Sequence, residues 1–175
     1  GGILNDQLGD AEQAIARFET VLENDGLRDQ AIEALRAVFF SAEYKERVFD
    51  ILEPIFLESS RHSDLVALRE HLVSTRDEPS FQREQLEAIA GLQEEQLEDI
   101  DAAFDAYARC LALDPAAADV IDTMTAFAAR CERQERLVEA LTAQAEAAAD
   151  DPDTAYFLRQ RVVGVLKDTL GDFDR

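Results

Sequence analysis

The chain has 175 residues, and its 38 acidic and 17 basic side chains give a formal net charge of -21 at pH 7. Such a charge repels phosphate backbones and anionic lipid head groups, so we expect no direct binding to nucleic acid. Apolar residues make up 47% of the sequence, enough for a core, but no apolar run approaches the roughly 20 residues that cross a bilayer.

Good helix formers dominate the composition, and glycine and proline lie mostly near expected helix ends. The short connections leave no room for a sheet, so the sequence predicts an all-α fold. Apolar residues at helical spacing predict about ten helices. In chain order these helices cover residues 3–8, 10–23, 28–41, 44–58, 64–75, 79–96, 100–113, 115–131, 134–149 and 152 onward, with another opening at Phe173.

Several expected helix boundaries carry recognisable signals. Asp10 can cap the helix that follows it, and Asp-Pro pairs begin new elements at residues 114–115 and 151–152. Pro54 is the one local contradiction, because an interior proline removes a backbone hydrogen bond and should kink or shift its helix.

A repeated unit is the clearest feature of the sequence. Residues 97–115 read LEDIDAAFDAYARCLALDP, residues 8–26 follow the same pattern, and it begins again at residues 170–172. The first two copies lie 89 residues apart, which exceeds a second internal spacing of 73 by about one helix and predicts an extra or irregular helix within residues 44–75. The 73-residue spacing aligns Asp77 with Asp150, Pro79 with Pro152, Gly91 with Gly164, Leu97 with Leu170, Asp99 with Asp172 and Asp101 with Asp174.

Recurring helical hairpins cannot bury their apolar faces alone and must stack on neighbours. We therefore expect an α-solenoid of antiparallel helices, a single repeat domain over residues 1–175 that is a fragment of a longer array. A closed helical bundle is the alternative, but a bundle has no reason to repeat its turns at fixed intervals.

The units resemble tetratricopeptide (TPR) repeats, in the manner of degenerate bacterial arrays with acidic, alanine-rich helices. The family pattern places Gly-Asp between two helices, then Ala, then an aromatic residue four positions later, and ends on Asp-Pro. The matching residues are Gly9, Asp10, Ala14, Phe18 and Asp25 in one unit, Asp99, Ala103, Tyr107, Leu111, Asp114 and Pro115 in the next, and Gly171 and Asp172. These residues specify packing and caps and carry no chemistry.

The resemblance implies a non-enzymatic scaffold that presents a concave groove to a peptide or protein partner. The Lys and Asn clamp by which some family members grip a chaperone tail has no match here. Phe39 and Phe40 are adjacent, so one helix cannot bury both on a narrow stripe; a second buried face of the helix is the alternative to a binding role. The residues assigned to partner binding are Arg36, Phe40, Gln85 and Arg161. The alternative function is a structural segment that self-associates through exposed end repeats.

Residues that could carry chemistry do not form a known motif. His62 and His71 lack a partner motif such as HExxH, and the acidic cluster at residues 94–101 lacks the alternating ligands of a calcium loop. Cys110 and Cys131 are expected to be buried thiols in a reducing cytoplasm. We therefore expect no enzyme activity, no cofactor and no metal.

Overall fold

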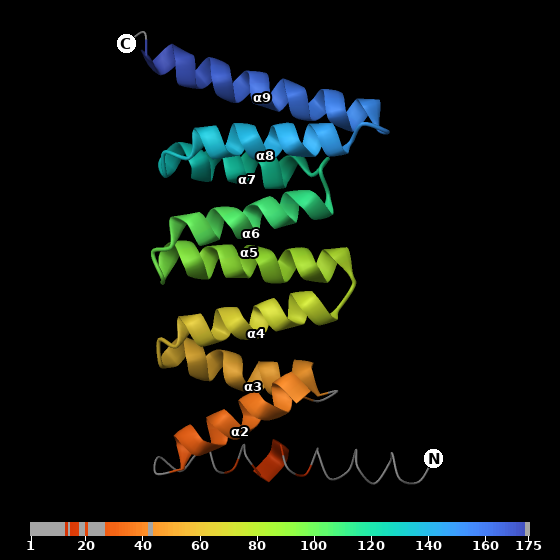
Figure 1. Ribbon diagram of the computed structural model, residues 1–175. Coiled ribbons are helices and arrows are strands. Elements are labelled where there is room, and N and C mark those ends of the chain that lie inside the picture. Colours follow the sequence, from red (N-terminus) through yellow and green to blue (C-terminus); the bar gives the residue numbers. More distant parts are fainter. Residues whose placement is uncertain (1–12, 14, 18–19, 21–26, 42–43, 174–175) are drawn as a thin grey trace. The chain divides into compact units, whose positions relative to one another are not determined.

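The computed structural model describes residues 13, 15–17, 20, 27–41 and 44–173, all within or between helices (Figure 1). The all-α prediction is confirmed for this part of the chain, which contains no strand. Contacts divide the chain into two compact units, Gly1–Leu72 and Val73–Arg175, called unit 1 and unit 2 below. The described helices are α2 (Arg28–Ser41), α3 (Lys45–Glu58), α4 (His62–Thr75), α5 (Pro79–Glu95), α6 (Ile100–Leu113), α7 (Ala118–Arg130), α8 (Gln134–Ala147) and α9 (Pro152–Phe173).

Most helix bounds agree with the predictions to within two residues. The clearest displacement is at α7, which begins at Ala118 instead of directly after Asp114. The Asp114 carboxylate accepts a hydrogen bond from the backbone N–H of Ala116 at 3.1 Å, and its carbonyl accepts one from Ala117 at 3.1 Å. This local turn delays the helix. The first TPR-like unit, at residues 8–26, and its helix at 10–23 lie almost entirely outside the described residues.

Pro54 lies inside α3 and does not end it. Proline cannot donate to the carbonyl four residues earlier, which belongs to Asp50. Both residues are exposed, so water can reach that carbonyl. The cost of an interior proline is therefore smaller here than it would be in the core.

The turn predicted at residues 170–172, and the new helix predicted to open at Phe173, are wrong. Helix α9 continues through these residues to Phe173. A glycine costs about 1 kcal/mol inside a helix, which weakens the helix but is not by itself enough to end it. Gly171 therefore lacks the role that the repeat pattern assigned to it.

Three hairpins share one kind of turn. The single residue with a left-handed backbone is Ser60 between α3 and α4, Glu98 between α5 and α6, and Glu132 between α7 and α8, with φ values of 55°, 54° and 56°. These positions are 38 and 34 residues apart. Residues 44–75, where the sequence predicts an extra or irregular helix, thus contain the same turn as the two hairpins that follow.

In each turn the next backbone N–H donates back into the preceding helix, a pattern that satisfies carbonyls at a helix end. The donors are Arg61, Asp99 and Arg133, the acceptors are Phe56, Gln93 and Ala128, and all three distances are 2.8 Å.

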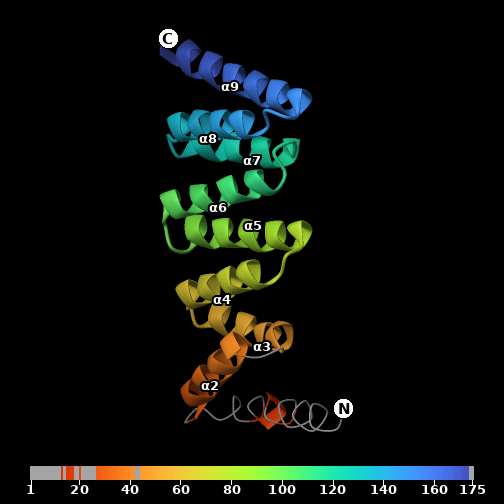
Figure 2. The ribbon, with the colours of Figure 1, turned by 45° about the vertical axis from the view of Figure 1, so that its right-hand side comes forward.

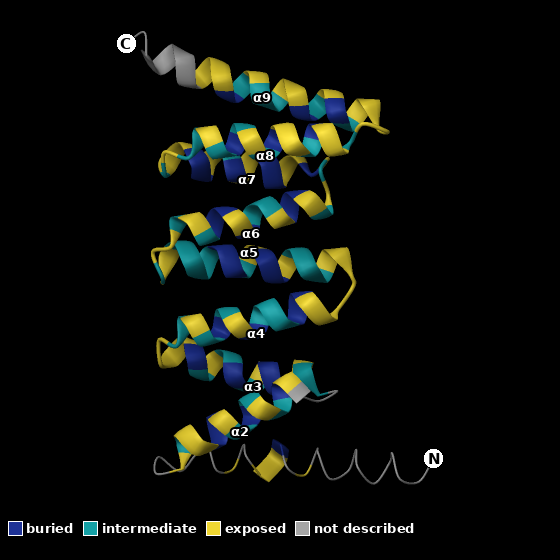
Figure 3. Ribbon diagram, viewed as in Figure 1, coloured by how far each residue is buried: buried dark blue, intermediate teal, exposed yellow. Residues whose placement is uncertain are grey.

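The core of each unit is a set of apolar stripes, seen as dark blue segments along the helices in Figure 3. In unit 2, α5 runs along α6, α6 also contacts α7 and α8, and α8 contacts α9 (Figure 2). In unit 1, α2 packs against α3. The large side chains that are almost fully buried include Leu35, Phe39, Leu52, Phe56, Leu65 and Leu68 in unit 1, and Leu86, Ile89, Leu111, Ile121 and Phe127 in unit 2.

Candidate functional site

The four residues assigned to partner binding fall in both units. Arg36 and Phe40 lie on α2 in unit 1, whereas Gln85 lies on α5 and Arg161 on α9 in unit 2. The assignment of Gln85 to an open groove is wrong, because its exposed fraction is only 5%. Its side chain occupies the inner stripe of α5 beside Leu86, a position that an apolar residue usually takes.

Phe40 is the exposed member of an aromatic cluster in unit 1. Its exposed fraction is 44%, whereas Phe39 is fully buried, as expected for adjacent helical residues. The Phe40 ring lies edge-on to Phe39, with 5.2 Å between centroids, and 4.9 Å from the ring of His71 on α4. These contacts hold Phe40 in place, because such aromatic pairs prefer edge-to-face geometry.

The third ring of this cluster belongs to a histidine with a perturbed acidity. Burial, with a smaller contribution from the positive charge of Lys45, lowers the pKa of His71 below its usual value of 6.5. The folded protein therefore favours the neutral imidazole.

Arg36 already has ionic partners within unit 1. Its guanidinium lies 3.1 Å from a carboxylate oxygen of Glu33 and 3.1 Å from one of Asp64. Arg61 joins the same group and lowers the pKa of Glu33 through a hydrogen bond. This network joins α2 to the start of α4, so Arg36 is engaged in holding the two helices together.

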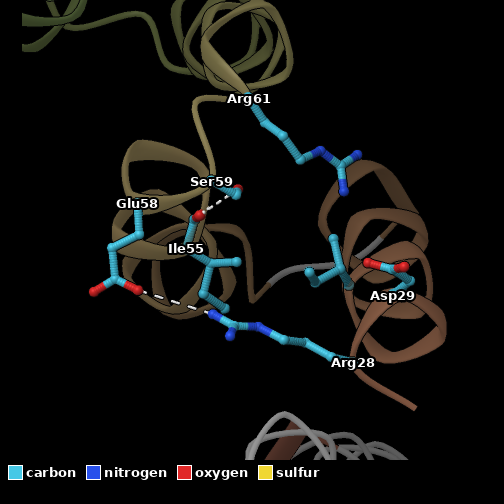
Figure 4. A pocket seen from close by; sticks show the side chains of 7 residues that line it. Arg28, Asp29, Ile55, Glu58, Ser59 and Arg61 are labelled. Carbon is cyan, nitrogen blue, oxygen red and sulfur yellow. Dashed lines mark hydrogen bonds and ion pairs between the residues drawn. The ribbon is translucent and has the colours of Figure 1, made fainter. Parts of the chain in front are cut away.

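Unit 1 also contains a pocket of about 350 Å³ between α2 and α3 (Figure 4). Ile55 lies at its centre, and Arg28 reaches across to Glu58, with 3.8 Å between the charged atoms. Asp29 and Arg61 add one charge of each sign. Because the charges balance, the pocket shows no preference for a ligand of one sign.

In unit 2, ion pairs hold α5, α7 and α9 side by side. Arg83 at the start of α5 pairs with Asp119 at the start of α7, and Glu94 near the end of α5 pairs with Arg130 at the end of α7. Since start meets start and end meets end, α5 and α7 run parallel. Arg161 on α9 is bound to Asp122 of α7 at 2.8 Å.

The other helices of unit 2 are joined in the same way. Arg133 and Arg136 at the start of α8 reach Asp101 at the start of α6, at 3.0 and 2.8 Å, and Arg136 also reaches Asp105 at 2.7 Å. Arg133 is the main cause that lowers the pKa of Asp101. Helices α6 and α8 are therefore also parallel neighbours.

Sequence reasoning missed a second role of these arginines. Six guanidinium groups in the described residues lie over a phenylalanine ring at 4.2 to 5.5 Å from its centroid, and each also pairs with a carboxylate. Only close pairs such as Phe127 with Arg130 and Phe157 with Arg161 have a helical spacing that could have been recognised. The pair of Phe104 and Arg136 is 32 residues apart and leaves no local signal.

The side of α5 and α7 that carries Arg83 and Asp119 is hollowed by a pocket of about 360 Å³. Tyr107 of α6 contributes to its lining, and burial, with a smaller effect of Glu94, raises the pKa of its hydroxyl. Arg83 lowers the pKa of Asp119 through their hydrogen bond, so this carboxylate stays charged. We call the surface formed by Arg83 and Glu87 of α5, Asp119, Asp122 and Thr123 of α7, and Arg161 of α9 the odd-helix face.

The residues examined for chemistry have structural surroundings. Cys110 is fully buried and its pKa is raised to about 11 by that burial, whereas Cys131 is half-buried; both are free thiols. The carboxylate of Asp99 accepts the backbone N–H of Ala102 at 3.0 Å and caps α6. In the described ranges, no three His, Cys, Asp or Glu side chains are grouped so that they could hold a metal ion.

No protein-family model matches the chain, and no curated protein sequence matches it significantly. The resemblance to TPR repeats therefore stays a prediction that rests on the motif residues. None of the helices within the described residues combines the length and the apolar content that a membrane span requires.

Proposed function

We propose that this chain is a non-enzymatic, TPR-like α-solenoid whose odd-helix face binds a peptide or protein partner. The observation that carries the proposal is the side-by-side arrangement of α5, α7 and α9, joined by arginine–carboxylate pairs. Side-by-side helices of successive hairpins are what a solenoid requires, and stacked repeats make extended binding surfaces. The repeated left-handed turns support the same architecture.

The odd-helix face has the properties of a preformed site. Its pocket of about 360 Å³ lies within the usual range for ligand sites and combines the apolar surface of Val120 with the polar groups of Thr123 and Tyr107. Arg83 and Arg161 are held by carboxylates on α7, so the helices that frame the face are fixed before a partner arrives. A preorganised surface loses less conformational entropy on binding.

Charge favours a cationic partner. The protein carries -21 charges, and the two arginines of the odd-helix face are already neutralised by Asp119 and Asp122. Glu87 adds a further carboxylate at the pocket. Lysine and arginine side chains of a partner would be attracted over the whole surface and would bind faster at low salt.

The chemistry of the site supports binding over catalysis. A nucleophilic cysteine needs an accessible thiolate, but Cys110 is buried with a pKa of about 11. Both histidines lie on α4, in the segment that connects the two units, and His71 is engaged with two phenylalanine rings. The face therefore offers contacts and charge and no activated group.

The proposal can be tested by selecting binders from a library of random displayed peptides. We expect enrichment of peptides rich in lysine and arginine. Replacing Thr123 by Arg fills the pocket and adds a repelling charge, so Thr123→Arg should weaken binding of the selected peptides by about tenfold or more. The binding constant is measured by fluorescence anisotropy at two salt concentrations.

Thr142→Arg is the matched control. It makes the same change at an exposed position of α8, which is not part of the odd-helix face, and should retain full binding. The proposal is wrong if no peptide is enriched over an unrelated acidic protein, or if both variants bind equally well.

A further inference from the structure

Helix α9 has two apolar faces, only one of which is covered. Ala155, Leu158 and Val165 are buried where α9 packs on α8. The opposite side exposes Tyr156 by 64%, Val163 by 42% and Leu166 by 44%. Positions 156, 163 and 166 share one side of a helix, so these side chains form a continuous stripe, which we call the outer face of α9.

The internal repeat indicates what normally covers such a face. The 73-residue alignment places Val162 and Val163 of α9 on Ile89 and Ala90 of α5. Ile89 and Ala90 are buried in unit 2, where α6 runs along α5. The same position in the repeat is thus covered by a helix on α5 and is open on α9.

The charges beside the outer face select the kind of helix that fits. Arg159 and Lys167 flank the stripe, are exposed, and form no ion pair with any described residue. They differ in this from Arg161 on the same helix, which is bound to Asp122. Two positive charges beside an apolar stripe complement a helix with acidic flanks.

A second copy of α9 is a poor occupant. In an antiparallel pair of α9 helices centred on Val163, Arg159 of one copy would face Lys167 of the other. Like charges placed opposite each other in an interface cost several kcal/mol. The chemistry of α6 fits better, because Asp101 and Asp105 accompany its buried stripe of Ala103 and Phe104.

We propose that the outer face of α9 is a docking site for an acidic amphipathic helix of a partner protein. The partner helix buries Tyr156, Val163 and Leu166 and places its carboxylates near Arg159 and Lys167. This site lies apart from the odd-helix face and does not depend on the function proposed for it.

A synthetic peptide of residues 99–115 with Cys110→Ser, stapled to hold a helix and labelled with a fluorophore, is a suitable probe. We expect saturable binding to the full chain by anisotropy. Val163→Glu should weaken this binding by about tenfold or more, because it places a charge in the apolar stripe. The double variant Arg159→Glu with Lys167→Glu should weaken it to a similar extent, and its residual binding should no longer fall with added salt.

Three controls keep the test specific. Leu57→Glu changes an equally exposed leucine on α3 of unit 1 and should bind the peptide as the unchanged chain does. Thr123→Arg should also bind normally, so failure of this site is distinguishable from failure of the odd-helix face. Tyr156→Ala, a second variant of the stripe, should weaken binding, and circular dichroism confirms that each variant is folded.

The proposal is overturned if the peptide shows no saturable binding at about 1 mM protein, or if Val163→Glu binds it normally. It is also overturned if sedimentation equilibrium shows a dimer of the unchanged chain that Val163→Glu dissociates, since a second copy would then cover the face.

Discussion

His71 makes the stability of unit 1 depend on pH through a single side chain. Its imidazole lies against Phe39 and Phe40, and burial lowers its pKa below 6.5. Because the folded state disfavours the charged form, the histidine contributes its full stability above pH 6.5. This contribution is lost as the pH falls through 6.5 toward the lowered value of the folded state.

His71→Phe should remove this dependence, because phenylalanine keeps an aromatic ring in the cluster and cannot be protonated. The free energy of unfolding of the two proteins should differ by a constant amount between pH 7 and pH 8. Below about pH 6 the unchanged chain should lose stability relative to the variant. Urea unfolding followed by circular dichroism at constant ionic strength measures the difference, and parallel pH profiles would contradict the assignment.

Helix ends are formed by local contacts that recur along the chain. Asp99 caps α6, and the Asp151 carboxylate accepts the backbone N–H of Thr154 at 3.2 Å in the first turn of α9. Between the paired helices, each turn contains a residue in the left-handed region, where side chains other than glycine are strained. No glycine occupies any of these three positions.

Glu132→Gly should therefore stabilise the protein by about 1 kcal/mol, since glycine adopts a positive φ without strain. Glu135→Gly is the matched control, because it removes the same charge three residues later, inside the first turn of α8. There glycine should destabilise the protein by about 1 kcal/mol. Urea unfolding measures both, and a loss of stability in both variants would show that the turn is not strained.

The hairpins of unit 2 are connected by charged side chains that lie on top of aromatic rings. Arg136 is the most heavily used, because it pairs with Asp101 and Asp105 of α6 and lies 4.5 Å from the centre of the Phe104 ring. An isolated surface ion pair contributes at most about 1 kcal/mol. A planar guanidinium that also stacks on a ring should contribute more than a point charge can.

Arg136→Ala should lower the free energy of unfolding by about 2 kcal/mol, and Arg136→Lys by about 1 kcal/mol, because lysine keeps the charge and loses the stacked plane. Arg159→Ala, at an exposed arginine of α9, should change it by less than about 0.5 kcal/mol. Chemical unfolding of the three variants tests this order. Equal effects of Arg136→Ala and Arg159→Ala would mean that the ion pairs between hairpins do not stabilise unit 2.

The amino-acid sequence alone was sufficient for the helices, because the signals that begin and end them act within a few residues. Arg28–Ser41 and the start of α5 at Pro79 agree with the structure, as does the exposure of one of the two adjacent phenylalanines. The local rules failed where a distant contact or a small cost decided the outcome, as at residues 170–173, through which α9 continues.

Only the tertiary structure decided which side chains remain available to a partner. Gln85 and Arg36 have polar groups typical of a binding surface, but one is buried and the other is bound to Glu33 and Asp64. Arg83 and Asp119, which frame the candidate pocket, are 36 residues apart in sequence. Ion pairs and burial between helices arise from the packing of segments far apart in the chain, so helical periodicity cannot reveal them.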